Sequence, residues 1–212
     1  LVGDDLGDDR LDLRRLDLAD LDVRVVVHTV VENAGPAAVS RNIKLVCDAD
    51  ESSRPVFADA HRLEIILTNL IGNAIKYGRE SGQIVVRVRD TDDALVIEVI
   101  DDGPGIAEDE LAHVFDRFFQ AGGPNRRKAG GVGIGLSLAR ELADLHGGKL
   151  TVHSQLGEGA TFRLVMPFGR VHIRPEAVER RRVQDRAFRH ARRIDDPRAT
   201  TAEIQVNTME SD

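Results

Sequence analysis

Segment 63–77 has apolar and polar residues spaced with the period of an α-helix. At about 100° per residue five of its apolar residues fall on one stripe: Leu63, Leu67, Leu70, Ile71 and Ala74. Its polar members gather on the adjoining stripe: Asn69, Asn73, Lys76 and Tyr77. Two amides and a cation on one stripe offer oxygen to a hard metal ion and positive charge to phosphate. The pattern indicates a core contact beside a ligand site; the alternative is a surface helix with incidental asparagines.

Helical spacing predicts two more long helices, over residues 21–39 and 136–145. We expect the first to be capped by Asp20 or Asp22 and to end near Gly35 and Pro36. Asp59 is the expected N-cap of the helix that contains segment 63–77, because its carboxylate can accept hydrogen bonds from the free N–H groups of the first turn.

Alternating apolar residues and turn signals predict strands over six segments: 43–47, 55–58, 83–89, 94–100, 149–154 and 160–167. The last four form two antiparallel hairpins. A short helix is expected over residues 108–114, and a short extended piece around 11–16. Together the elements predict an α/β two-layer sandwich, in which a mixed, mostly antiparallel sheet is covered on one face by three helices.

Composition narrows the class of protein. The chain has 212 residues, 42% hydrophobic and 31% charged, enough for one core with extensions. Its net charge of -7 argues against nucleic acid as a partner, because phosphate binding needs a basic face. A single cysteine, Cys47, excludes an internal disulfide framework and favours a reducing compartment. No apolar run approaches the roughly 20 residues of a membrane span, so we expect a cytoplasmic chain.

Charge and glycine content divide the chain into three expected parts. Residues 1–20 form an acidic linker, residues 21–168 form the folded domain, and residues 169–212 form an arginine-rich tail that is disordered or partly helical. Within the domain, residues 120–131 lack apolar anchors and are rich in glycine, which predicts a mobile loop.

Two glycine-bearing segments are candidates for chemistry. Gly131, Gly133 and Gly135 lead into a helix N-terminus, where free N–H groups and the helix dipole favour an anion. They match neither the Walker A loop nor the Rossmann fingerprint, and glycines before a helix can also serve only as a hinge. The second segment, 101–105, begins with Asp101 at a strand end. Its carboxylate can accept a hydrogen bond from an exocyclic amino group, and its glycines let a flat ring approach; a tight turn is the alternative.

The order of these segments resembles the catalytic and ATP-binding domain of bacterial sensor histidine kinases, within the wider group shared with gyrase, mismatch-repair and heat-shock chaperone ATPases. The matching motifs are the N box at 69–77, the first glycine box at 101–105, the F box at 115–119, the second glycine box at 131–136 and the closing motif GEGATF at 157–162. The resemblance covers roughly residues 21–168 and implies the sandwich fold already expected.

The resemblance implies Mg²⁺ and ATP as cofactors. Asn73 would coordinate Mg²⁺, while Asn69 and Lys76, the implied catalytic residues, would approach the phosphates. Tyr77 would pack on the adenine and Asp101 would accept its amino hydrogen bond. The remaining implied ATP-binding residues are Gly103, Gly105, Ile106, Arg117, Phe118, Lys128, Gly131, Gly133, Gly135, Leu136 and Thr161.

Asn69 also bears on the type of reaction. The related ATPases carry a glutamate at this place, four residues before the metal-binding asparagine, to activate water. An amide cannot act as a general base at neutral pH, so transfer to a protein acceptor is favoured over hydrolysis. The resemblance therefore implies a histidine kinase that signals in a two-component system.

The implied acceptor is a histidine in an H-E-[LIV]-R-x-P type helix, and no histidine of this chain has that setting. We expect a helical dimerisation segment with this histidine to precede Leu1, a homodimer to form only through that segment, and phosphate to pass on to a response regulator receiver domain. Two alternatives stay open: a stand-alone ATP-binding regulatory module and an anti-sigma-type serine kinase. Anchoring of the parent protein in the bacterial inner membrane also stays open.

Overall fold

The computed structural model describes residues 16–50, 53–120 and 132–170. In chain order its helices and strands are β1 (Ala19–Leu21), α1 (Val23–Ser40), β2 (Lys44–Ala49), β3 (Val56–Ala58), α2 (Ala60–Tyr77), β4 (Gln83–Asp90), β5 (Ala94–Asp101), α3 (Glu108–Leu111), α5 (Gly135–Leu145), β6 (Lys149–Gln155) and β7 (Gly159–Pro167). Most of three predicted segments lies outside the described residues: 121–131 of the loop predicted at 120–131, 11–15 of the extended piece predicted around 11–16, and 171–212 of the tail predicted at 169–212.

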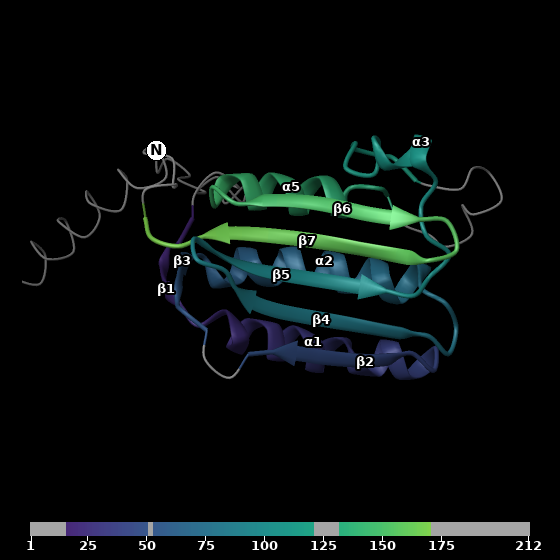
Figure 1. Cartoon of the computed structure of the whole chain (residues 1–212), viewed down its shortest axis with the longest axis horizontal. Helices are drawn as coiled ribbons and strands as arrows, with labels where there is room; N and C mark the ends of the chain where they lie inside the picture. Colours follow the sequence, from purple (N-terminus) through teal and green to yellow (C-terminus); the bar gives the residue numbers. More distant parts are fainter. Residues whose placement is uncertain (1–15, 51–52, 121–131, 171–212) are drawn as a thin grey trace, which may run out of the picture. The chain divides into compact units, whose positions relative to one another are not determined.

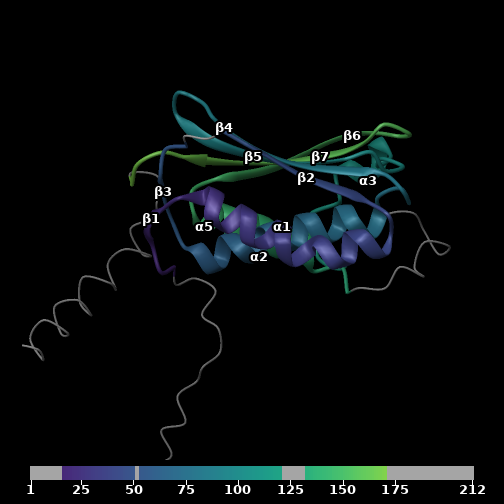
Figure 2. The same cartoon turned by 90° about the horizontal axis from the view of Figure 1, so that it is seen from below.

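Five strands form the main sheet in the order β2-β4-β5-β7-β6. β2 is parallel to β4, and the other neighbouring pairs are antiparallel. Helices α1, α2 and α5 cover one face of this sheet (Figures 1 and 2). The predicted two-layer α/β sandwich is therefore confirmed. The predicted strand at 55–58 pairs instead with β1, in a separate two-stranded sheet.

Helix α2 lies in the middle of the helical layer and supplies the centre of the core. Its side chains Leu63, Leu67, Leu70 and Ile71 have no exposed surface. Asp59 caps the helix as predicted, because its carboxylate accepts a hydrogen bond from the Arg62 N–H. The apolar stripe of the sequence is thus the buried face of α2.

Helix α1 does not end near Gly35 and Pro36 as expected, since it continues through both residues to Ser40. A proline inside a helix removes one backbone hydrogen bond. Here the turn beyond it is held because Ala38 is buried in the core and its carbonyl accepts the Ile43 N–H. Asp22 caps the start of α1, accepting from the Arg24 N–H. In contrast, α3 is shorter than the predicted helix at 108–114.

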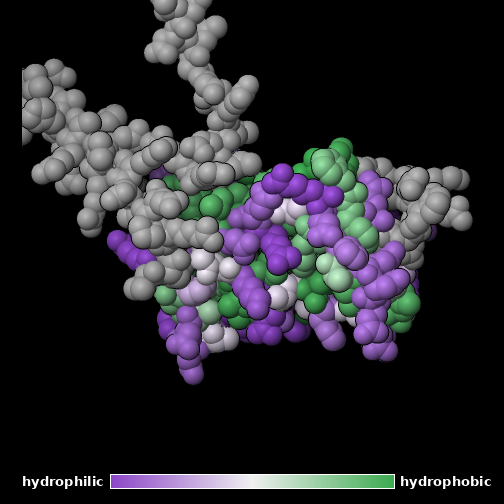
Figure 3. Space-filling model, turned by 90° about the horizontal axis from the view of Figure 1, so that it is seen from above, coloured by the Kyte–Doolittle hydropathy of each residue, from purple (hydrophilic) through white to green (hydrophobic). Residues whose placement is uncertain are grey.

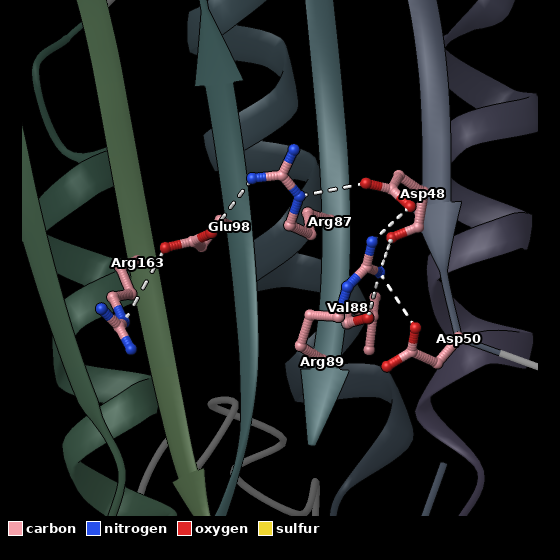
Figure 4. Close-up of polar contacts among 7 residues, drawn as sticks. All are labelled: Asp48, Asp50, Arg87, Val88, Arg89, Glu98 and Arg163. Carbon is pink, nitrogen blue, oxygen red and sulfur yellow. Dashed lines mark hydrogen bonds and ion pairs between the residues drawn. The ribbon is translucent and has the colours of Figure 1, made fainter. Parts of the chain in front are cut away.

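The face of the sheet away from the helices carries ion pairs that cross its strands (Figure 4). Arg87 on β4 lies 3.0 Å from Asp48 on β2 and 3.9 Å from Glu98 on β5. Arg163 on β7 pairs with the other oxygen of Glu98. Charges of alternating sign suit a sheet face in contact with water.

The surface is mixed in character. On the side where β6, α5 and α3 lie, hydrophilic residues alternate with hydrophobic patches (Figure 3). No helix in the described part of the chain combines the length and apolar character that crossing a membrane requires.

Candidate functional site

A cavity of about 430 Å³ lies at one end of α2, bounded also by the end of β5, the start of α5 and β7. It is lined by ten of the residues predicted for the site: Asn69, Asn73, Lys76, Tyr77, Asp101, Gly105, Ile106, Gly133, Gly135 and Leu136. Segments that are far apart in the chain therefore meet at one hollow. Its volume is within the usual range for small-molecule sites.

Asn69 and Asn73 form the α2 wall of the cavity. The Asn69 Nδ2 donates to the Ile65 carbonyl at 2.8 Å, which turns its Oδ1 toward the start of α5. A Cβ added to Gly135 would collide with that oxygen, so glycine is what lets α5 approach α2 here. Within the part of the chain described, the Asn73 side-chain amide has no hydrogen-bond partner. Its oxygen is therefore available to a ligand.

Lys76 and Tyr77 form the end of the same wall. The Lys76 Nζ donates to the Tyr77 hydroxyl at 2.8 Å and lies 4.6 Å from the centre of the Tyr77 ring. Arg41 holds this last turn of α2 in place, since its guanidinium donates to the carbonyls of Ile75, Lys76 and Gly78. The half-exposed Tyr77 ring offers a flat surface to a ligand.

Asp101 ends β5 and places a carboxylate in the cavity. Burial raises the pKa of the Asp101 carboxyl, and the nearby Asp102 adds to this, although hydrogen bonds from the backbone N–H groups of Gly103 and Ala160 partly oppose the shift. The Gly103 hydrogen bond is 2.9 Å long. A partly desolvated carboxylate beside an apolar wall is a strong acceptor for an amino group.

The two glycines after Asp101 have different positions. Gly105 lines the cavity with a φ of 70°, and a Cβ there would collide with the Gln155 carbonyl. Gly103 does not line the cavity. Gly103 is instead required by the tight turn that follows β5, because a Cβ there would lie 2.6 Å from the Asp101 Oδ1.

The F box contributes Phe119 rather than the predicted Phe118. Phe118 is 68% exposed, has a φ of 67° and donates its N–H to the Gly133 carbonyl at 2.8 Å. This left-handed turn directs the next residue, Phe119, into the cavity. Phe115 packs edge-on against Phe162, which lines the cavity.

Two further predicted residues lie away from the cavity. Arg117 is held on the surface by Glu141 of α5, at 2.6 Å. Thr161 lies between Ala160 and Phe162 on β7, and those two line the cavity. Because side chains alternate along a strand, Thr161 faces the other side of the sheet. Lys128 and Gly131 lie outside the described residues.

Sequence reasoning missed nine residues of the cavity wall: Ala74, Pro104, Val114, Phe119, Gln120, Val132, Ile134, Ala160 and Phe162. The period of two along β7 could have found Ala160 and Phe162, since both share a face with the core residue Leu164. The others are mainly apolar residues for which the sequence carries no comparable signal.

The cavity suits a ligand with a flat apolar part and an anionic part. Apolar side chains and Tyr77 lie beside the Asp101 acceptor, whereas Lys76 and the first turn of α5 offer positive charge and free N–H groups. No group of three or more His, Cys, Asp or Glu residues that could hold a metal occurs among the residues described. A Mg²⁺ ion bound by one side-chain oxygen together with ligand phosphates and water would fit Asn73.

Comparisons with known proteins agree with this arrangement. Residues 58–170 match the family described as histidine kinase-, DNA gyrase B-, and HSP90-like ATPase. The signal transduction histidine-protein kinase AfsQ2 of Streptomyces coelicolor is 48% identical over 109 residues, which cover 51% of this chain and 20% of AfsQ2. The chain spans 17% to 27% of the length of four such curated relatives.

Solved structures show the same likeness. Full-length ShkA in complex with AMPPNP aligns with a TM-score of 0.65 and 29% identity, covering 76% of this chain and 33% of ShkA. The histidine kinase ThkA, in complex with the response regulator protein TrrA, aligns with a TM-score of 0.60 and 25% identity, covering 72% of this chain and 42% of ThkA.

Proposed function

Because the chain belongs to the histidine kinase-, DNA gyrase B- and HSP90-like ATPase family, we propose that residues 21–168 are the ATP-binding catalytic part of a two-component sensor histidine kinase. The observation that carries the proposal is the cavity itself. It brings the amides and Lys76 of α2, the Asp101 carboxylate and the glycine-led start of α5 to one place. Each is a group that one part of ATP requires.

The adenine end of the ligand would lie at Asp101 and Tyr77. The Asp101 carboxylate would accept a hydrogen bond from the exocyclic amino group, and the Tyr77 ring would pack on the base. The partly apolar lining favours a neutral ring over water there. Guanine carries an oxygen where adenine carries its amino group, so the same carboxylate would repel that edge.

The phosphate end would lie where α2 meets α5. Lys76, whose ammonium would turn away from the Tyr77 hydroxyl, and the N–H groups of the first turn of α5 would bind the phosphates, and Asn69 would orient them from α2. Asn73 would hold Mg²⁺, which when bound neutralises phosphate charge. Phosphoryl transfer depends mostly on such positioning and charge neutralisation, so these residues need supply no nucleophile.

The phosphate acceptor in this proposal is a histidine on a helical dimerisation segment, with a response regulator receiver domain as the next acceptor. Asn69 supports transfer over hydrolysis, because an amide cannot take a proton from water at neutral pH. The complex of ThkA with the response regulator protein TrrA supports the second partner by similarity.

The proposal is tested with protein produced together with its native upstream sequence, incubated with Mg-ATP labelled in the γ-phosphate. We expect acid-labile, alkali-stable phosphohistidine whose label passes to a receiver domain. ATP binding without any transfer would refute kinase activity and indicate a regulatory module. Acid-stable phosphate on a partner serine would instead indicate the anti-sigma-type serine kinase.

A further inference from the structure

A buried polar cluster joins α2 and α5 at the ends of these helices that lie away from the cavity. The His146 side chain, at the C-cap of α5, is 1% exposed, and Asp59, the N-cap of α2, is 6% exposed. The Asp59 backbone N–H donates to the His146 Nε2 at 3.1 Å, and the His146 Nδ1 lies 2.7 Å from the Leu142 carbonyl.

These two contacts define how the imidazole is held. The Leu142 carbonyl can only accept, so the Nδ1 atom carries the hydrogen and the Nε2 atom is the acceptor for the Asp59 N–H. A neutral ring with both nitrogens engaged is fixed in rotation. It forms a directional link from the last turn of α5 to the start of α2.

The same two helices touch again at the cavity, where Gly135 of α5 meets Asn69 of α2. Asp59 and Asn69 are ten positions apart along the chain, and Gly135 and His146 are eleven apart, so the contacts match an antiparallel pair. Eleven helical residues span about 16 Å. Contact at both ends fixes the tilt of α5 and thereby the place of its first turn.

We propose that His146 is a positioning residue for nucleotide binding: by accepting the Asp59 N–H it sets the first turn of α5 against Asn69 in the cavity. The proposal rests on the proposed ATP-binding function. A helix that is free to shift at its far end would move the N–H groups that receive phosphate, and small displacements of binding groups have large effects on affinity and rate.

The Asp59 carboxylate extends this link to the N-terminal side of the domain. Its Oδ2 accepts the Asp17 backbone N–H at 2.7 Å, and its Oδ1 accepts the Arg62 N–H at 3.0 Å. The neighbouring side chains Leu16 and Leu18 are buried, and β1 pairs with β3 just before Asp59. The segment that leads into the domain is thus anchored on the residue that His146 contacts.

The test compares two substitutions in the 212-residue chain. His146→Leu fills similar space without an acceptor, and we expect weaker binding of a fluorescent ATP analogue, by up to roughly fivefold when the whole net free energy of the lost hydrogen bond is transmitted to the cavity. His146→Gln places an amide oxygen near the Nε2 position, and we expect it to restore most of the affinity. If His146 only stabilised the fold, the Leu and Gln variants would bind the analogue equally well once their stabilities were matched.

Val30→Ala is the matched control. Val30 is a buried residue of α1 that does not line the cavity, so its truncation lowers the melting temperature without altering the link. We expect Val30→Ala to bind the analogue as the wild type does at a temperature where all variants are folded. Equal affinity of His146→Leu and the wild type, or equal losses in the Leu and Gln variants, would overturn the proposal.

Hydrogen exchange of the nucleotide-free protein separates this inference from the proposed function. We expect His146→Leu to accelerate exchange of the Leu138 N–H, which bonds to the Ile134 carbonyl in the first turn of α5, whereas Val30→Ala leaves it unchanged. This readout needs no ATP. A wild type that fails to bind ATP would refute the proposed function, while unaltered exchange in His146→Leu would refute the role of His146.

Discussion

Gly135→Ala tests how closely α5 must approach α2 at the cavity. The φ angle of Gly135 is not positive, so alanine fits the backbone there. Alanine in a helix gains up to about 1 kcal/mol over glycine. Its Cβ would however collide with the Asn69 Oδ1, and overpacking costs about 1–3 kcal/mol.

The collision is expected to outweigh the gain in helix propensity. Asn69 can swing away only by giving up its 2.8 Å hydrogen bond to the Ile65 carbonyl, which costs about 1 kcal/mol. We therefore expect Gly135→Ala to lower the free energy of unfolding by about 1 kcal/mol. ATP affinity should fall as well, because the first turn of α5 is pushed out of the cavity.

A double-mutant cycle measured by urea unfolding isolates the collision. In an Asn69→Ala background the oxygen is gone, so Gly135→Ala should become neutral or stabilising by up to about 1 kcal/mol. If Gly135→Ala is equally destabilising with and without the Asn69 side chain, the contact between these two residues is not what requires glycine, and the reasoning is refuted.

Three further substitutions test the α2 and β5 walls. Asn73→Ala should abolish Mg-dependent ATP binding in calorimetry while the melting temperature stays unchanged. Thr68→Ala, at an exposed position of α2, is the matched control. Retained affinity in Asn73→Ala would contradict the assignment of Asn73 to Mg²⁺. Asp101→Asn should remove a pH dependence of stability. Burial raises the pKa of the Asp101 carboxyl in the folded state, so the wild type loses stability as the pH rises from the ordinary pKa of 3.8 through the pKa of the folded state. Thermal melts of the variant at several pH values should lack that loss. Arg41→Ala should lower the free energy of unfolding, measured in urea, by about 1–3 kcal/mol, because the carbonyls at the end of α2 lose a charged donor. Arg41→Lys cannot reach all of these carbonyls, so it should recover only part of the lost stability.

Local patterns were sufficient for most of the architecture. The apolar stripe of 63–77 became the buried face of α2, and the Asp59 side chain capped it, because both depend on helix periodicity and on groups within one turn. The hairpins β4–β5 and β6–β7 followed from the alternation of apolar and polar residues, which is also a local pattern. The end of α1 did not follow from a local pattern. The tendency of Pro36 to end a helix is overridden by the burial of Ala38 in the core.

The candidate site was predictable as a set of segments and less so as individual side chains. Motif spacing identified Asn69, Asn73 and Asp101, all of which line the cavity. It did not distinguish Phe118 from Phe119, because the choice depends on a left-handed turn at Phe118 that bonds to Gly133.

The sequence by itself determined the order of helices and strands from α1 onward, the buried stripe of α2 and the family, because these follow from periodicity, capping and motif order along the chain. Only the tertiary structure decided which side chains face the cavity and which face solvent. Arg117 turns to Glu141, and His146 receives the Asp59 N–H, through contacts between residues 24 and 87 positions apart. Such pairings are set by the packing of α5 on the rest of the fold, and no local pattern encodes them.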